Sequence, residues 1–111
     1  MTADDDAAVP DPEPQPEAGQ PVITRLVTIA NKRGLHARAA AKFATLAERF
    51  NASVDVYRDG QTVSARSIMG LMMLGAGMGA TIELRAQGGW DAREALEALA
   101  GLVEAGFDES G

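Results

Sequence analysis

The sequence predicts an α+β fold in the order βαββαβα, with a four-stranded antiparallel sheet and three helices on one of its faces. Two observations predict it. Residues 23–30, 53–58 and 80–86 are rich in β-branched residues or alternate apolar with polar side chains, which is typical of half-buried strands. Residues 37–50 and 90–104 instead repeat apolar side chains at the helical period. Four strands with helices over one face form an open-faced sandwich.

Length and composition limit what the chain can be. Its 111 residues are enough for one small domain and too few for two. The absence of cysteine excludes a disulfide framework and a thiolate metal site. A single histidine also excludes a multi-histidine metal centre. We expect no metal and no cofactor.

The charge is concentrated at the N-terminus. Six of the 16 acidic residues and none of the ten basic residues lie in residues 1–20, so the net charge of −6 belongs to this segment. All five prolines fall between positions 10 and 21. We expect residues 1–21 to be a disordered tail, and composition favours a solubilising extension over a recognition tail. The domain is expected at 22–107, followed by a flexible end at 108–111.

The first strand, at residues 23–30, leads into a polar turn at 31–34. Residues 37–50 then predict a helix, which Asn51 ends. The apolar residues that share one face of this helix are Ala40, Phe43, Ala44, Ala47 and Phe50.

A hairpin and a short helix are predicted next. The strand at 53–58 is followed by Asp59-Gly60, a strong hairpin signal, and residues 62–66 return as its partner. Ser67 is a suitable N-cap for a helix over residues 68–74, which a glycine ends.

A strand at 80–86 and a helix at 90–104 complete the order. We expect Trp90 to pack at the start of this helix. Its acidic residues should form a solvated face: Asp91, Glu94, Glu97 and Glu104. The buried side should hold Ala92, Ala95, Leu96, Leu99, Leu102 and Val103. The glycines at 75, 77 and 79 match neither common nucleotide-loop pattern and are expected to serve turns.

The start of the first helix carries the candidate chemistry. His36 falls at the cap position, so we expect the first backbone N–H groups of the helix to lack a side-chain partner. Such groups and the helix dipole attract an anion, and Arg38 adds a guanidinium suited to phosphoryl oxygens. A neutral imidazole beside these N–H groups and this guanidinium could attack a phosphoryl donor. From these features alone, a surface histidine with a neighbouring arginine remains the favoured interpretation.

Two stretches resemble signatures of a known family. Gly34-Leu35-His36-Ala37-Arg38 with Ala40-Ala41-Lys42-Phe43 resembles the active-site signature of the histidine-containing phosphocarrier (HPr) family of the phosphoenolpyruvate-dependent phosphotransferase system. Residues 67–75 resemble that family's second, regulatory signature. Both stand at the family's spacing, and the similarity covers about residues 22–107.

The resemblance implies an HPr-like open-faced sandwich that carries phosphoryl groups and is not itself an enzyme. His36 would be phosphorylated on Nδ1 by phospho-enzyme I, which draws on phosphoenolpyruvate, and would pass the group to a IIA-type acceptor. Arg38 would contact the phosphoryl group, aided by the backbone N–H groups of Ala37 and Arg38. Such a protein is expected to be a cytoplasmic monomer.

One position departs from the signature. The family usually has proline directly after this arginine, whereas this chain has Ala39. Proline stiffens the first turn of a helix, and alanine keeps helix propensity and adds one N–H donor. We expect transfer to survive with some loss of rigidity.

Ser67 has two compatible roles. As a helix N-cap it contributes about 1 kcal/mol. The resemblance implies that it is also phosphorylated by the ATP-dependent HPr kinase/phosphorylase. A phosphate there would place about two negative charges beside an apolar surface and weaken docking.

The helix after Ser67 is too short to bury all of its apolar residues. We expect Leu71 and Leu74 to belong to the core and Ile68, Met69 and Met72 to form an exposed docking surface. In the family, the matching positions contact enzyme I and the acceptors.

Other functions remain as alternatives. The carrier could serve sugar uptake or a branch that regulates nitrogen or carbon metabolism. A docking module without phosphotransfer competes with both, although His36 and Arg38 argue against it. The neutral body opposes binding to nucleic acid. The apolar run from residue 68 to 82 is broken by four glycines and is too short to span a membrane.

Overall fold

The computed structural model describes residues 21–109, so most of the predicted tail and the last two residues lie outside the described chain. The elements follow the predicted order βαββαβα. They are β2 (Ile23–Thr28), α1 (Ala37–Ala47), β3 (Ser53–Arg58), β4 (Gln61–Ser64), α2 (Ile68–Met73), β5 (Thr81–Gln87) and α3 (Ala92–Glu104), followed by the 3-10 turn η1 (Gly106–Asp108).

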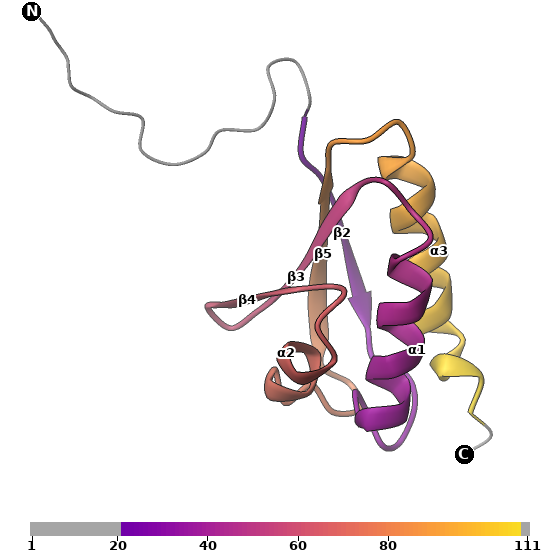
Figure 1. The fold of residues 1–111 in the computed structure, drawn as a ribbon. Helices are drawn as coiled ribbons and strands as arrows, with labels where there is room; N and C mark the ends of the chain where they lie inside the picture. The colour runs from indigo at the N-terminus through magenta and orange to yellow at the C-terminus, as the bar shows by residue number, and fades with distance from the viewer. Residues whose placement is uncertain (1–20, 110–111) are drawn as a thin grey trace, which may run out of the picture.

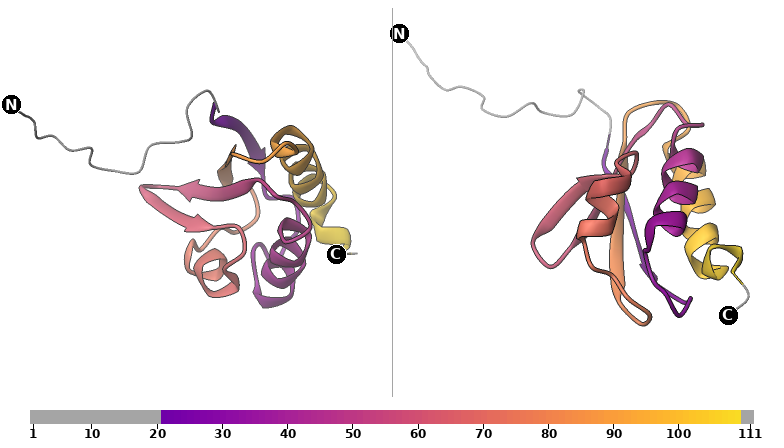
Figure 2. Two further views of the ribbon diagram at one scale, coloured as in Figure 1. Left: turned by 45° about the horizontal axis from the view of Figure 1, so that its top comes forward. Right: turned by 60° about the horizontal axis from the view of Figure 1, so that its bottom comes forward.

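The strands form one sheet in the order β2-β5-β3-β4, and all neighbours are antiparallel. Helices α1 and α3 lie side by side over one face, and α2 packs against α1 next to β4 (Figure 1). The two further views show the opposite face of the sheet without a helix (Figure 2). The predicted open-faced sandwich is confirmed.

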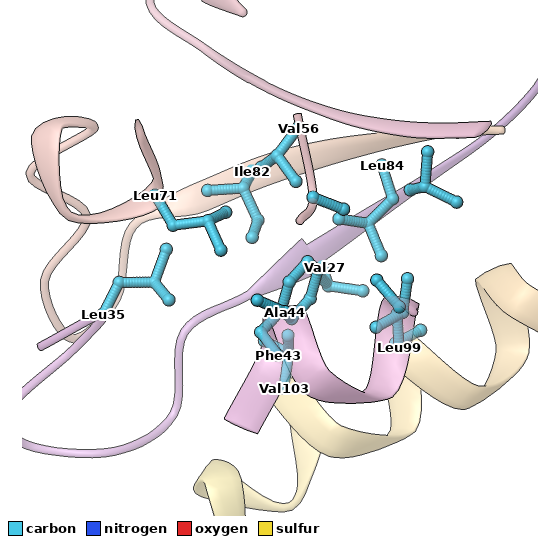
Figure 3. Close-up of a cluster of buried hydrophobic side chains, with 14 of the residues drawn as sticks. Val27, Leu35, Phe43, Ala44, Val56, Leu71, Ile82, Leu84, Leu99 and Val103 are labelled. Carbon is cyan, nitrogen blue, oxygen red and sulfur yellow. The ribbon is translucent and has the colours of Figure 1, made fainter. Parts of the chain in front are cut away.

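The core lies between the sheet and the helices (Figure 3). Val56 and Leu84 of the sheet, Phe43 of α1, Leu71 of α2 and Leu99 of α3 are each at most 1% exposed. Fully burying a side chain of this size contributes about 1.5–3 kcal/mol. Because all three helices supply buried residues, the sheet and helices stabilise one another.

Helix α1 ends at Ala47, earlier than Phe50, the predicted last residue. The reason is a contact with a distant segment. The Asp91 carboxylate accepts hydrogen bonds from the backbone N–H groups of Asn51 and Ala52, each at 2.9 Å. These bonds tie the segment after α1 to the start of α3, so the chain leaves the helical path.

Two expectations at the start of α3 were wrong. Asp91 is 3% exposed and does not lie on the solvated face, because its carboxylate binds the segment after α1. Trp90 is 81% exposed and does not pack at the helix start. The chain turns at Gly89, whose φ is +68° and where a Cβ would lie 2.7 Å from the nitrogen of Ala52. This tight turn lets Asp91 occupy the buried position, and Trp90 faces solvent.

Candidate functional site

The turn before α1 is held against the loop after α2. The backbone N–H of Leu35 donates to the carbonyl of Ala76 at 2.9 Å. Gly34 adopts a φ of +65°, and a Cβ on it would lie 2.4 Å from the same carbonyl oxygen. Only glycine fits this approach. The turn therefore fixes where the next residue, His36, begins the helix.

His36 is the N-cap of α1, with extended backbone angles of φ −76° and ψ 178°. Its Nδ1 accepts a hydrogen bond from the backbone N–H of Arg38 at 3.2 Å. The expectation that the first N–H groups would lack a side-chain partner is therefore wrong for Arg38, because an imidazole nitrogen can serve as the cap. Since Nδ1 accepts, it carries a lone pair and the proton of a neutral ring sits on Nε2.

A carboxylate from the end of the chain binds the other ring nitrogen. Nε2 of His36 faces the Glu109 carboxylate, and Asn31 Nδ2 donates to Glu109 Oε1 at 2.9 Å and to the Gly34 carbonyl at 3.0 Å. The hydrogen bond from Asn31 lowers the pKa of Glu109 most, and the bond with His36 lowers it further. No local pattern in the sequence indicates this contact, which joins residues 73 positions apart.

A cleft of about 510 Å³ opens at the helix start. The residues that line it are Arg33, His36, Ala37 and Arg38. The structure thus brings the predicted site residues together and adds Arg33, which is exposed like Arg38. Lys32 and Arg33 are adjacent in the turn before His36, and this basic pair is the signal in the sequence from which Arg33 could have been predicted. Two guanidinium groups and a helix N-terminus make this cleft suited to an anion.

The second predicted site lies on α2. Ser67 is its N-cap, and its Oγ accepts a hydrogen bond from the backbone N–H of Gly70 at 3.0 Å. Ile68, Met69 and Met72 are 42%, 68% and 39% exposed, and Met73, which was not predicted to belong to this surface, is 72% exposed. These four side chains form an apolar surface on a helix that packs against α1.

Two further features bear on function. Within residues 21–109, no three histidine, aspartate or glutamate side chains come together as a metal site would require. In the same part of the chain, no helix is long and apolar enough to cross a membrane.

The lowered pKa of Glu109 predicts a pH-dependent stability. The stabilisation should be fully present above the ordinary pKa of 4.5 and should be lost as the pH falls through the lowered folded-state value. We expect wild type to be more stable than Glu109→Gln near neutral pH and the difference to shrink in acid. Denaturant unfolding midpoints measured between pH 3 and 7 check this, in steps of about half a unit.

The Asn31→Ala background supplies the control. The Asn31 amide is the largest cause of the lowered pKa of Glu109. In the Asn31→Ala background, Glu109→Gln should therefore change the unfolding midpoint less as the pH varies. An equal effect in both backgrounds would show that the amide does not stabilise the carboxylate.

Comparison with known proteins identifies relatives along most of the chain. The family model described as the phosphorylation site of the HPr component of the phosphotransferase system matches residues 23–105. The phosphocarrier protein NPr of Shewanella violacea is 50% identical over 88 residues, which cover 79% of this chain and 96% of that protein. The phosphocarrier protein HPr of Cupriavidus necator is 48% identical over 88 residues, covering 79% and 98%.

A solved structure agrees with the sequence comparison. The crystal structure of HPr-C-His from Thermoanaerobacter tengcongensis superimposes with a TM-score of 0.75 and 42% sequence identity. The match covers 80% of this chain and 99% of that one. Sequence and fold thus point to the same group of proteins.

Proposed function

This chain belongs to the HPr family of phosphotransferase-system phosphocarriers, and we propose that it carries the phosphoryl group on Nδ1 of His36. Proteins of this family are carriers rather than catalysts. The observation that carries the proposal is the hydrogen bond from the Arg38 N–H to Nδ1. Nδ1 can accept that bond only through a lone pair, so in this tautomer Nδ1 is the nucleophilic nitrogen, and it lies at the N-terminus of a helix in a cleft lined by Arg33 and Arg38.

The transfer step follows from this geometry. The Nδ1 lone pair attacks the phosphorus of phospho-enzyme I, and a nitrogen–phosphorus bond forms as the bond between phosphorus and enzyme I breaks. The Arg38 N–H then loses its acceptor on the ring and can donate to a phosphoryl oxygen. The helix dipole and the guanidinium groups of Arg33 and Arg38 offset the arriving negative charge.

Glu109 supports the same step from the other side of the ring. Its carboxylate faces Nε2, so the Nε2 proton has an acceptor while Nδ1 reacts. After transfer the ring carries a positive charge, which the carboxylate balances. A IIA-type acceptor reverses the step by attacking the same phosphorus and returning the lone pair to Nδ1.

Ala39 lies away from this chemistry. It is fully buried in the first turn of α1 and does not line the cleft. The departure from the family signature therefore lies outside the residues that line the cleft. This supports our proposal that transfer is retained.

The proposal is tested by incubating the full chain with phosphoenolpyruvate, Mg²⁺ and enzyme I. We expect one acid-labile phosphoryl group, detected by intact mass, and nitrogen-15 NMR of the ring should assign it to Nδ1. Phosphorylation at Nε2 would contradict the tautomer argument. Adding IIA-type acceptors of the sugar-uptake and nitrogen-regulatory branches separately then assigns the branch.

Ser67 is proposed as the regulatory site, acted on by HPr kinase/phosphorylase, next to the docking surface of Ile68, Met69, Met72 and Met73. We expect Ser67→Asp to raise the KM of enzyme I for this carrier about tenfold with kcat little changed, which corresponds to about 1.4 kcal/mol of lost binding. The reason is a negative charge placed beside the apolar surface. Steady-state kinetics with enzyme I measure this.

Ser67→Asn is the matched control. Asparagine and aspartate are equally good N-caps, so both variants keep α2 and differ only in charge. The control should retain the wild-type KM. If both variants raise KM equally, charge beside the docking surface does not govern binding.

A further inference from the structure

A groove runs along α1 next to the cleft at His36, which we call the phosphoryl cleft. This α1 groove has a volume of about 420 Å³ and lies between α1, Leu102 of α3 and the end of η1. Three bases line it: Arg38 and Lys42, which stand one turn apart on α1, and Arg49, which follows the end of the helix. Asp108 also lines the groove, so its charge is predominantly positive.

The three bases of the groove are not paired with acids of the folded domain that the structure describes. Lys42 is half-buried, and its Nζ donates to the Phe107 carbonyl at 2.8 Å, which holds it in place. Within residues 21–109, none of the ion pairs involves these three bases, whereas Arg25, Arg58 and Arg85 each pair with an acid. The groove therefore offers positive charge that the folded domain does not neutralise.

The rest of the lining is apolar. Ala41, Leu46 and Leu102 are half-buried and contribute to the groove wall. A suitable occupant therefore combines regularly spaced negative charges with small apolar groups. The first 20 residues of this chain have that composition, with six acids, no base and a proline at every second position from Pro10 to Pro16.

We propose that the acidic N-terminal tail, residues 1–20, docks on the α1 groove of its own chain. This assigns the tail a binding role, where composition alone favoured a solubilising extension. The contact does not depend on phosphoryl transfer. The charge of the whole chain supports it, because residues 21–111 carry equal numbers of acids and bases and the excess negative charge lies in the tail.

The tail joins the domain at the end of the molecule where α1 ends, so it can reach the α1 groove. Ile23 pairs with Ala86 at the end of β5, which leads into α3, and Asp91 at the start of α3 binds Asn51 just after α1. The start of β2 and the end of α1 therefore lie at one end of the molecule (Figure 1). Ten extended residues reach about 33 Å, whereas α1, from Ala37 to Ala47, is only about 16 Å long.

The number of charges also agrees. Asp11, Glu13 and Glu17 are three acids within seven residues, and the groove is lined by three bases. Three exposed ion pairs between these groups would together change the equilibrium constant for docking by about tenfold.

The docked tail would have a consequence for the carrier. Arg38 lines both the groove and the phosphoryl cleft, so a tail in the groove covers part of the surface beside His36. Partner proteins and the tail would then compete for Arg38. This consequence rests on the proposed function, whereas the docking itself is tested without any partner.

The absence of native cysteine allows a sharp test on the full chain. A spin label on Gln15→Cys should broaden the amide signals of residues 38–49 in the ¹⁵N-labelled protein at low salt. Replacing Asp11, Glu13 and Glu17 with their amides should lower the equilibrium constant for docking about tenfold. About 1 M salt should have the same effect, because it shortens the Debye length to about 3 Å.

Two variants separate the groove from general positive charge. Arg49→Gln should weaken the broadening, and Lys32→Gln, which removes an exposed base outside the groove, should leave it unchanged. The proposal is overturned by three results: no broadening at low salt, broadening that salt and neutralisation do not reduce, or broadening centred elsewhere. A mixture tests whether the contact is intramolecular. One component carries the spin label without ¹⁵N, and the other is ¹⁵N-enriched without a spin label. Broadening in this mixture equal to that within a single chain also overturns the proposal.

Discussion

We expect His36→Ala to abolish phosphoryl acceptance from enzyme I while the domain stays folded. The variant removes Nδ1, which is the nucleophile in our proposal, and no other imidazole exists in the chain. It also removes the cap that accepts from the Arg38 N–H, which costs about 1 kcal/mol of stability. Intact mass after incubation with phosphoenolpyruvate, Mg²⁺ and enzyme I measures acceptance, and urea unfolding measures stability.

His36→Asn separates the two roles. Asparagine is among the best N-caps, so this variant should recover most of the stability that alanine loses. It should still accept no phosphoryl group, because an amide is not a nucleophile for this step. A phosphoryl adduct on either variant would move the site to another residue.

We expect Gly34→Ala to destabilise the domain by about 3 kcal/mol, from about 1 kcal/mol for a left-handed backbone and the remainder for overpacking. The φ of Gly34 is +65°, and the added Cβ would lie 2.4 Å from the Ala76 oxygen and 2.8 Å from the Gly77 Cα. Both are backbone atoms, which cannot rotate away. Urea unfolding at 25 °C measures the loss, and acceptance from enzyme I should fall because the turn positions His36.

Gly75→Ala is the matched control for this prediction. Gly75 has a φ of +64°, and its Cβ would meet nothing within 4 Å. It should therefore show only the backbone cost of about 1 kcal/mol. If the two variants lose the same stability, the contact between the turn and the loop after α2 is not tight.

Most of the fold could be predicted from the sequence because its signals are local. The strand alternation at 53–58, the Asp59-Gly60 turn and the Ser67 cap each depend on residues within a few positions. The site residues His36 and Arg38 were found in the same way, since they stand two positions apart at a helix start. The family signature then gave these residues a chemical role.

The features that could not be predicted depend on contacts between distant segments. Its position in the helical pattern predicts that Asp91 is solvated. Its carboxylate is buried because it accepts hydrogen bonds from Asn51 and Ala52, which are 40 and 39 positions away. Those bonds also end α1 early and leave Trp90 exposed. Glu109 follows the last helix, and nothing near it in the chain indicates that it faces His36.

The sequence by itself determined the order of the elements, the caps and turns that begin and end most of them, and the two residues that define the candidate site. The tertiary structure alone decided which acids are buried, which carboxylate faces the imidazole and which bases share a groove. The physical reason is range. Backbone propensity and periodicity act over a few residues, whereas a hydrogen bond joins any two groups that packing brings within about 3 Å.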